Sequence, residues 1–287
     1  MTFKQWIFSI RAENDVYGGQ WKFPHILTLC IAITLIVALT LVFRKKSRGA
    51  RESVVKTLAI VVLVFEVVYR VTHFAKGDVV GVGSALRLIF PSAWSGIACW
   101  LLIIAAVGNK KTLWNFSAIN GLFCSVVFFI YPTVGFVHKT MLFDDWYAVL
   151  THSILFLSAI CTITLSLGDF RYKRETFVDG FLKELIALGC VLVYVAGVTF
   201  VSKVAGKVAV DPLYFMPNNG VQAVLGMRYL VYAVLYALGV CVWVNAFYVI
   251  PMLWKKLGKG EKQTESVHTA KTGRYVKTKG EQMKKHK

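Results

Sequence analysis

The chain has 287 residues, of which 56% are hydrophobic, and its mean hydropathy is +0.59. A water-soluble globular protein is not expected to be this apolar, so the composition favours an integral membrane protein. The net charge of +18 is typical of nucleic-acid-binding proteins, but the basic residues are grouped between and after long apolar segments, which argues against nucleic acid as a partner.

Seven apolar segments follow one another along the chain. As helices, segments of about 20 residues at about 1.5 Å per residue are long enough to cross a hydrocarbon core of about 30 Å. We therefore expect an all-α membrane protein with seven transmembrane helices. The expected spans are residues 24–43, 54–74, 86–107, 113–136, 146–167, 182–203 and 229–253.

The basic residues predict the orientation of these spans. Of the 33 lysines and arginines, 23 lie in, or within three residues of, the connections after spans one, three and five and the segment after span seven. In seven-span proteins these four segments share one side, and the positive-inside rule places that side in the cytoplasm. We therefore expect the N-terminus outside and the C-terminus in the cytoplasm.

The same reasoning divides the chain into three parts: an extracytoplasmic segment, residues 1–23, a membrane domain, residues 24–254, and a basic tail, residues 255–287. The tail is expected to be disordered, since it has eleven basic residues against three glutamates. It would either bind anionic lipid of the inner leaflet or only fix the topology. The long connection 204–228 is expected to fold over the outer face.

Most of the polar residues inside the spans gather toward the outer side. Counting about 1.5 Å of depth per residue from the span ends places them in the outer half of the membrane. A charge in hydrocarbon costs at least about 2.5–3.5 kcal/mol, so such residues are usually paired or functional. Those in the outer half are Glu66, Arg70, Ser92, Ser95 and His152, and the further candidates at or just above this level are His25, Arg87, Asp211 and Arg228.

Glu66 and Arg70 are four residues apart, with the acid first, which places both on one helix face in the favourable order for an ion pair. We expect them to belong to one buried polar network. The pair either fixes the helix within the bundle or orients and binds a substrate headgroup, and the sequence leaves both roles open.

His152 is the candidate general base, because a neutral imidazole is cheaper to bury than a lysine and can accept a proton. Ser92 and Ser95 follow Pro91, which can bend the helix and open space beside them. The serines would be nucleophiles or simply small packing residues, and His152 would be a base or a hydrogen-bonded core residue. We expect no cofactor and no metal, because neither the histidines nor the six cysteines have ligand spacing.

The order of these motifs resembles the YwaF-type bacterial membrane proteins. The chain reads FPHILTL at span one, FEVVYRVTHF at span two, RLIFPSAWSGIAC at span three, GLFCSVVFFIYP at span four and VLTHSILF at span five, followed by a DPLYxxP motif. It is more distantly similar to the eukaryotic seven-span acyltransferases of that superfamily. The resemblance covers about residues 24–254 and implies a multi-pass protein of the bacterial plasma membrane.

The resemblance also implies transfer of acyl chains onto phospholipids, but only part of the motif is kept. His152 matches the histidine on span five by position. The cysteine nucleophile of the eukaryotic enzymes does not carry over, because Ser92 and Ala93 follow Pro91 here. Either a serine or Cys99, deeper in the span, takes its place, or the chemistry is lost.

Three classes of function therefore remain open from sequence. The first is an intramembrane enzyme for lipid acyl transfer or ester hydrolysis, with His152 as base. The second is a non-catalytic binder or transporter of a small molecule or lipid. The third is a membrane assembly partner that acts through its basic tail.

Overall fold

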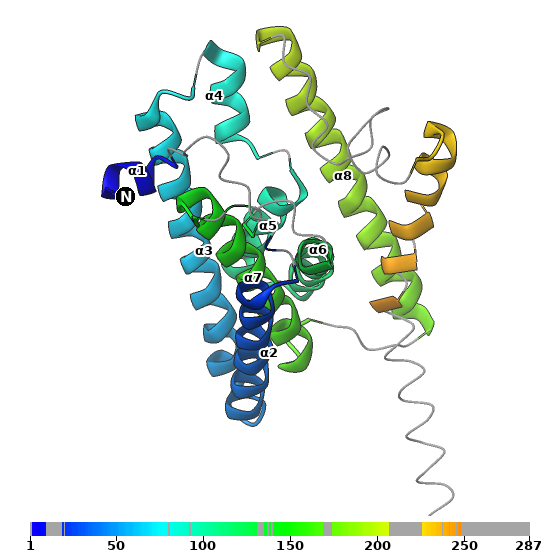
Figure 1. Cartoon of the computed structure of the whole chain (residues 1–287). Helices are drawn as coiled ribbons and strands as arrows, with labels where there is room; N and C mark the ends of the chain where they lie inside the picture. Colours follow the sequence, from blue (N-terminus) through cyan, green and yellow to red (C-terminus); the bar gives the residue numbers. More distant parts are fainter. Residues whose placement is uncertain are drawn as a thin grey trace, which may run out of the picture.

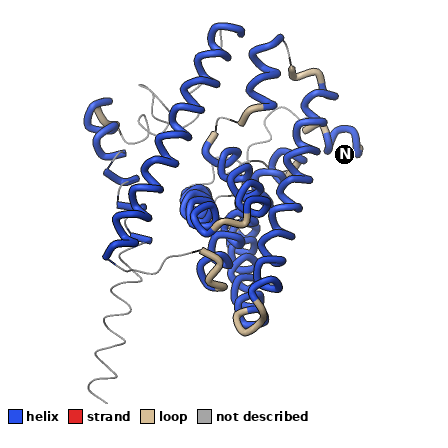
Figure 2. Tube along the Cα trace, turned by 180° about the vertical axis from the view of Figure 1, so that it is seen from behind, coloured by secondary structure: helices blue, strands red, loops and turns tan. Residues whose placement is uncertain are grey.

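In the computed structural model, every helix or strand element among the described residues is a helix (Figure 2). The structure describes residues 2–9, 19, 21–79, 81–91, 93–130, 135–136, 138, 140–168, 174–206, 226–236, 238–240, 242–244 and 246–247. The helices are α1 (Phe3–Ile7), α2 (Phe23–Phe43), α3 (Arg48–Lys76), α4 (Gly81–Ile89), α5 (Trp94–Gly108), α6 (Lys111–Ile130), α7 (Phe143–Thr164) and α8 (Arg174–Gly206).

Three of these helices, α2, α6 and α7, are long and apolar enough to cross a membrane. Three shorter apolar helical stretches lie at Trp94–Gly108, Leu185–Val198 and Tyr229–Val244. The predicted helical membrane-protein class agrees with these elements. The count of seven spans and their orientation remain predictions.

The helix ends carry the expected local signals. Pro24 lies in the first turn of α2, where its missing N–H removes no helical hydrogen bond. The hydroxyl of Ser47 accepts a hydrogen bond from the amide of Ala50 and caps α3, and Gly77, with φ of 81°, ends it in the left-handed conformation. At α7, the carboxylate of Asp145 accepts a hydrogen bond from the amide of Leu142 at 3.0 Å.

Helices α3, α5, α6 and α7 pack together around the largest apolar core, with α2 lying along α7 (Figure 1). Val62 from α3, Leu102 from α5, Trp114 from α6 and Leu155 from α7 are all fully buried there. The same four helices therefore fix the relative positions of any polar side chains that they carry higher in the bundle.

The third predicted span, residues 86–107, is not one helix. α4 ends at Ile89 and α5 begins at Trp94, with Pro91 between them. Proline has no N–H to donate and disfavours a helical conformation in the residue before it, which accounts for the break. As a result, α4 leaves the four-helix core and lies against α8 (Figure 1).

A polar network at the N-terminal end of α3 links this helix to α5 and α6. Glu52 is paired with Arg48 at 2.7 Å and accepts a hydrogen bond at 3.1 Å from Asn109, the residue directly after α5. Asn109 in turn accepts one from the indole of Trp114 on α6 at 3.2 Å. Burial disfavours the charged form of Glu52, but the hydrogen bonds from Arg48 and Asn109 outweigh it, so its pKa is lowered from the ordinary value of 4.5.

Candidate functional site

A polar cavity of about 500 Å³ opens between α3, α4, α5 and α7. It lies beside the break between α4 and α5, because Pro91 and Ala93 form part of its wall. The break therefore separates α4 from the core enough to leave this space. Its lining residues with polar side chains are Glu66, Tyr69, Arg70, His73, Asp78, Ser84, Ser95 and Tyr147.

The innermost charged group of the cavity is the predicted pair on α3. Arg70 Nη1 lies 2.6 Å from Glu66 Oε2 and also donates to the backbone carbonyl of Glu66 at 2.8 Å. The side chain of Glu66 is 1% exposed and that of Arg70 is 16% exposed. The prediction that these two residues belong to one buried polar network is confirmed, and Arg70 is the partner nearer to the open space.

Tyr147 of α7 completes this pair. Its hydroxyl donates to the second carboxylate oxygen of Glu66, Oε1, at 2.5 Å. Its ring stacks on Tyr69 with centroids 4.0 Å apart and planes 15° apart. Both oxygens of Glu66 are therefore engaged, and the two aromatic rings form one wall of the cavity between α3 and α7.

A second group of charges stands above the pair, at the end of α3. His73 Nδ1 lies 3.0 Å from Asp78 Oδ2 and His73 Nε2 lies 3.5 Å from Asp144 Oδ1 on α7. Lys76 Nζ lies 3.1 Å from the same Asp78 oxygen. Among the described residues, no group of three or more histidines, cysteines and carboxylates is placed to hold a metal ion.

Behind the pair lie two side chains of α5. The thiol of Cys99 is fully buried and interacts with Glu66. The ring of Trp100 lies under Arg70, whose guanidinium carbon is 5.6 Å from the ring centroid, a distance suited to a cation–π contact. These contacts fix the arginine from below and leave its other side toward the cavity.

Ser95 and Arg70 each have a polar atom with no protein partner among the described residues. The hydroxyl of Ser95 lines the cavity and makes no hydrogen bond within the part of the chain that the structure describes. The Nε of Arg70 is buried and also has no acceptor among those residues. Ser95 thus gives the cavity a hydroxyl that its own walls leave unused, whereas the Nε of Arg70 is enclosed by protein.

His152 lies elsewhere. Its Nδ1 is 2.7 Å from the carbonyl of Ala148 in its own helix, and its ring stacks on Phe128 of α6 with centroids 4.1 Å apart. It is not among the residues that line the polar cavity. The pairing of His152 with Ser92 stays a prediction, because Ser92 lies outside the described residues.

The other predicted site residues are also outside the cavity wall or not described. His25 is buried among Trp21, Phe129 and Phe136, and its Nδ1 accepts a hydrogen bond from the amide of Trp21 at 3.0 Å. Arg228 is exposed just before Tyr229–Val244. The side chain of Arg87, Asp211, most of the 204–228 connection and the tail lie outside the described residues.

Sequence reasoning missed the residues that give the site its shape. The sequence-based candidates did not include Tyr147, Tyr69 and Asp78, which line the cavity, or Asp144, which contacts the lining residue His73. Tyr69 had a usable signal, since it lies three residues after Glu66 and so on a neighbouring helix position. Tyr147 had none, because an aromatic residue near a span end is usually a membrane-interface residue.

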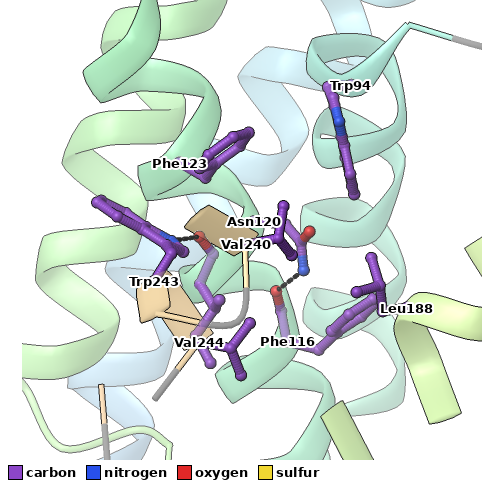
Figure 3. A pocket seen from close by; sticks show the side chains of 9 residues that line it. Trp94, Phe116, Asn120, Phe123, Leu188, Val240, Trp243 and Val244 are labelled. Atoms are coloured by element: carbon purple, nitrogen blue, oxygen red, sulfur yellow. Dashed lines mark hydrogen bonds between the residues drawn. The ribbon is translucent and has the colours of Figure 1, made fainter. Parts of the chain in front are cut away.

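A second, smaller cavity lies between α5, α6, α8 and the Tyr229–Val244 helix (Figure 3). Figure 3 shows the amide of Asn120 turned to the carbonyl of Phe116, and the Trp243 indole donates to the carbonyl of Ile119 at 3.2 Å. Its volume of about 20 Å³ is enough for about one water molecule. We therefore assign it to packing.

Comparison of the chain with protein-family models, with curated proteins and with solved structures finds no match.

Proposed function

We propose that this chain is a seven-span membrane protein of the YwaF type, with its N-terminus outside, that binds a small polar ligand or a lipid headgroup in the cavity between α3, α4, α5 and α7. The observation that carries the proposal is the arrangement of Glu66, Arg70 and Tyr147 around about 500 Å³ of space. That volume falls within the range of about 300–1,000 Å³ that is usual for ligand pockets.

Arg70 distinguishes a binding role from a purely structural one. A pair that only fixed α3 within the bundle would be covered by side chains, whereas the side chain of Arg70 lines the cavity. A ligand oxygen that accepts from the part of the guanidinium that faces the cavity would form a charge-assisted hydrogen bond, which is about twice as strong as a neutral one.

The test is ligand retention by the purified protein. Wild type, Arg70→Met and Arg48→Met would be isolated in the same mild detergent, and bound small molecules and lipids identified by native mass spectrometry. We expect a species bound to wild type and to Arg48→Met but absent from Arg70→Met. Equal retention by all three proteins, or no bound species under any condition including added lipid extract, would refute binding at this cavity.

The seven-span topology has its own test. Single cysteines introduced at Gln5 and Ala270 would be exposed to a membrane-impermeant thiol reagent in intact cells, with the unsubstituted chain as background. We expect labelling at Gln5→Cys only, and labelling at Ala270→Cys only after the membrane is opened. Labelling of both positions from the same side would rule out an odd number of spans.

Lipid acyl transfer or ester hydrolysis is the second candidate function. It is favoured by the Ser95 hydroxyl in the cavity wall, a candidate nucleophile that is left once Ser92 is set aside. Turnover of a fluorescent phospholipid would be compared among wild type, Ser95→Ala and His152→Ala. A loss of about 10²–10⁴-fold on removing a general base supports catalysis by His152, and unchanged turnover excludes it.

A further inference from the structure

The charges in and around the cavity nearly cancel. Its described lining carries two carboxylates, those of Glu66 and Asp78, and one guanidinium, that of Arg70, together with the imidazole of His73. The residues that contact these groups from behind, Lys76 and Asp144, add one charge of each sign. The site is therefore neutral to within about one charge, whichever form His73 takes, and a ligand with a large net charge would be opposed by part of the wall.

The hydrogen-bond donors and the free acceptor nevertheless lie at different ends of the cavity. The side chains that can donate on the inner side of the cavity are those of Arg70 and Ser95, both of which line it. Both carboxylate oxygens of Glu66 are already taken by Arg70 and Tyr147, so Glu66 offers no free acceptor there. This inner side suits an anionic group, which a guanidinium and a hydroxyl would hold together.

The open acceptor lies at the outer end. His73 and Lys76 both contact Oδ2 of Asp78, and Oδ1 of that carboxylate has no partner among the described residues. His73, which contacts Asp78, is three residues beyond Arg70, or about 4.5 Å along the axis of α3. Between the two ends, the side chains of Tyr69 and Tyr147, stacked on each other, line the wall.

From this polarity we propose that the ligand is a zwitterion, with an anionic group at Arg70 and Ser95 and an ammonium group at Asp78. The inference rests on the proposed binding function and specifies its ligand class. A carboxylate or a phosphodiester would serve as the anionic group. The ligand is therefore either a free amino acid-like molecule or the headgroup of an ethanolamine phospholipid.

The experiment compares whole zwitterions with their separate halves. Binding to the purified full-length protein would be measured by titration calorimetry with β-alanine, glycerophosphoethanolamine and dihexanoyl phosphatidylethanolamine. The matched halves are propionate, dimethyl phosphate and ethanolamine. We expect at least one zwitterion to bind about tenfold or more tightly than either of its halves, since each half loses one charged contact worth about 1.4 kcal/mol or more.

The three zwitterions also separate the two sources. Preference for the dihexanoyl lipid over glycerophosphoethanolamine assigns the ligand to the membrane, and preference for β-alanine assigns it to the water phase. Tighter binding of an isolated anion or of ethanolamine than of every zwitterion overturns the proposal.

Two substitutions place the ligand in the cavity. Arg70→Met should weaken both the zwitterion and its anionic half, whereas Asp78→Asn should weaken the zwitterion by about tenfold and leave the anionic half unchanged or stronger. Lys46→Met, in the exposed turn after α2, is the control and should change neither. Equal loss of both probes in Asp78→Asn contradicts the assigned ends.

The two proposals can fail separately. If native mass spectrometry finds a ligand that depends on Arg70 but no zwitterion binds, the ligand class is wrong and the binding function stands. If neither a retained ligand nor a zwitterion is found, both are wrong.

Discussion

Loss of Arg70 should destabilise the protein far more than loss of Arg48, although both arginines form four-residue-spaced pairs with glutamates on α3. The bond lengths are nearly equal, at 2.6 Å for Arg70–Glu66 and 2.7 Å for Arg48–Glu52. The exposures differ: 16% and 1% for the first pair, 46% and 10% for the second. Removing one partner of a buried pair costs about 3–5 kcal/mol, whereas an exposed pair is worth about 0–1 kcal/mol.

The expected midpoint shifts follow from these energies. At about 2–4 °C per kcal/mol for a chain of this size, Arg70→Met should lower the thermal midpoint by roughly 6–20 °C and Arg48→Met by roughly 0–4 °C. The midpoints would be measured by tryptophan fluorescence in detergent micelles. The double variant Glu66→Gln/Arg70→Met should be more stable than Arg70→Met, because it leaves no unpaired buried carboxylate. Equal shifts for the two arginines, or strict additivity in the double variant, would refute the reasoning.

Three further predictions use matched pairs. Tyr147→Phe should lose about 1.5–3 kcal/mol of stability because it removes a hydrogen bond to a charged carboxylate, whereas Tyr69→Phe, whose hydroxyl has no described partner, should be nearly neutral in the same thermal assay. Gly135→Ala should lower the free energy of unfolding by at least about 1 kcal/mol, because the φ of Gly135 is 95° and the new Cβ would lie 2.7 Å from a valine methyl. Gly121→Ala should be tolerated better, because its new Cβ would lie 3.5 Å from the nearest atom. Because the pKa of Glu52 is lowered, the stabilisation by its carboxylate is present above pH 4.5 and is lost as the pH falls through the lowered pKa. The difference in thermal midpoint between wild type and Glu52→Gln should therefore shrink at acid pH. A difference that grows at acid pH would contradict this reasoning.

The positions of most helices could be predicted from the sequence, because they follow from counting residues in apolar segments. Glu66 and Arg70 were paired correctly for the same reason, since their spacing within one helix determines whether they can meet. The break at Pro91 could be anticipated as a bend, but the departure of α4 toward α8 could not, because it depends on contacts with a helix more than 80 residues later in the sequence.

The direction in which each helix faces was the information that the sequence lacked. Tyr147 and His152 are five residues apart on α7, which rotates them by about 140° around the helix axis. Their depth suggested that His152 belongs with Glu66, but the packing turns Tyr147 to Glu66 and His152 to Phe128. Nearly every side of these helices is apolar, so no hydrophobic stripe indicates which side faces the core.

The interruption at Pro91 also affects the thickness of the apolar layer across which a transmembrane voltage would fall. α4 has 9 residues and α5 has 15, which give lengths of about 14 Å and 22 Å. Backbone that is not helical is tolerated at membrane depth only where protein covers it or water reaches it, and the polar cavity beside Pro91 has room for water. If α4 and α5 together form the third of the seven proposed spans, the insulating layer along this path is close to the length of α5 rather than the full hydrocarbon thickness of about 30 Å. A given transmembrane voltage then falls over a shorter distance here, and a charge at Arg70 feels a steeper field than one at the same depth in lipid.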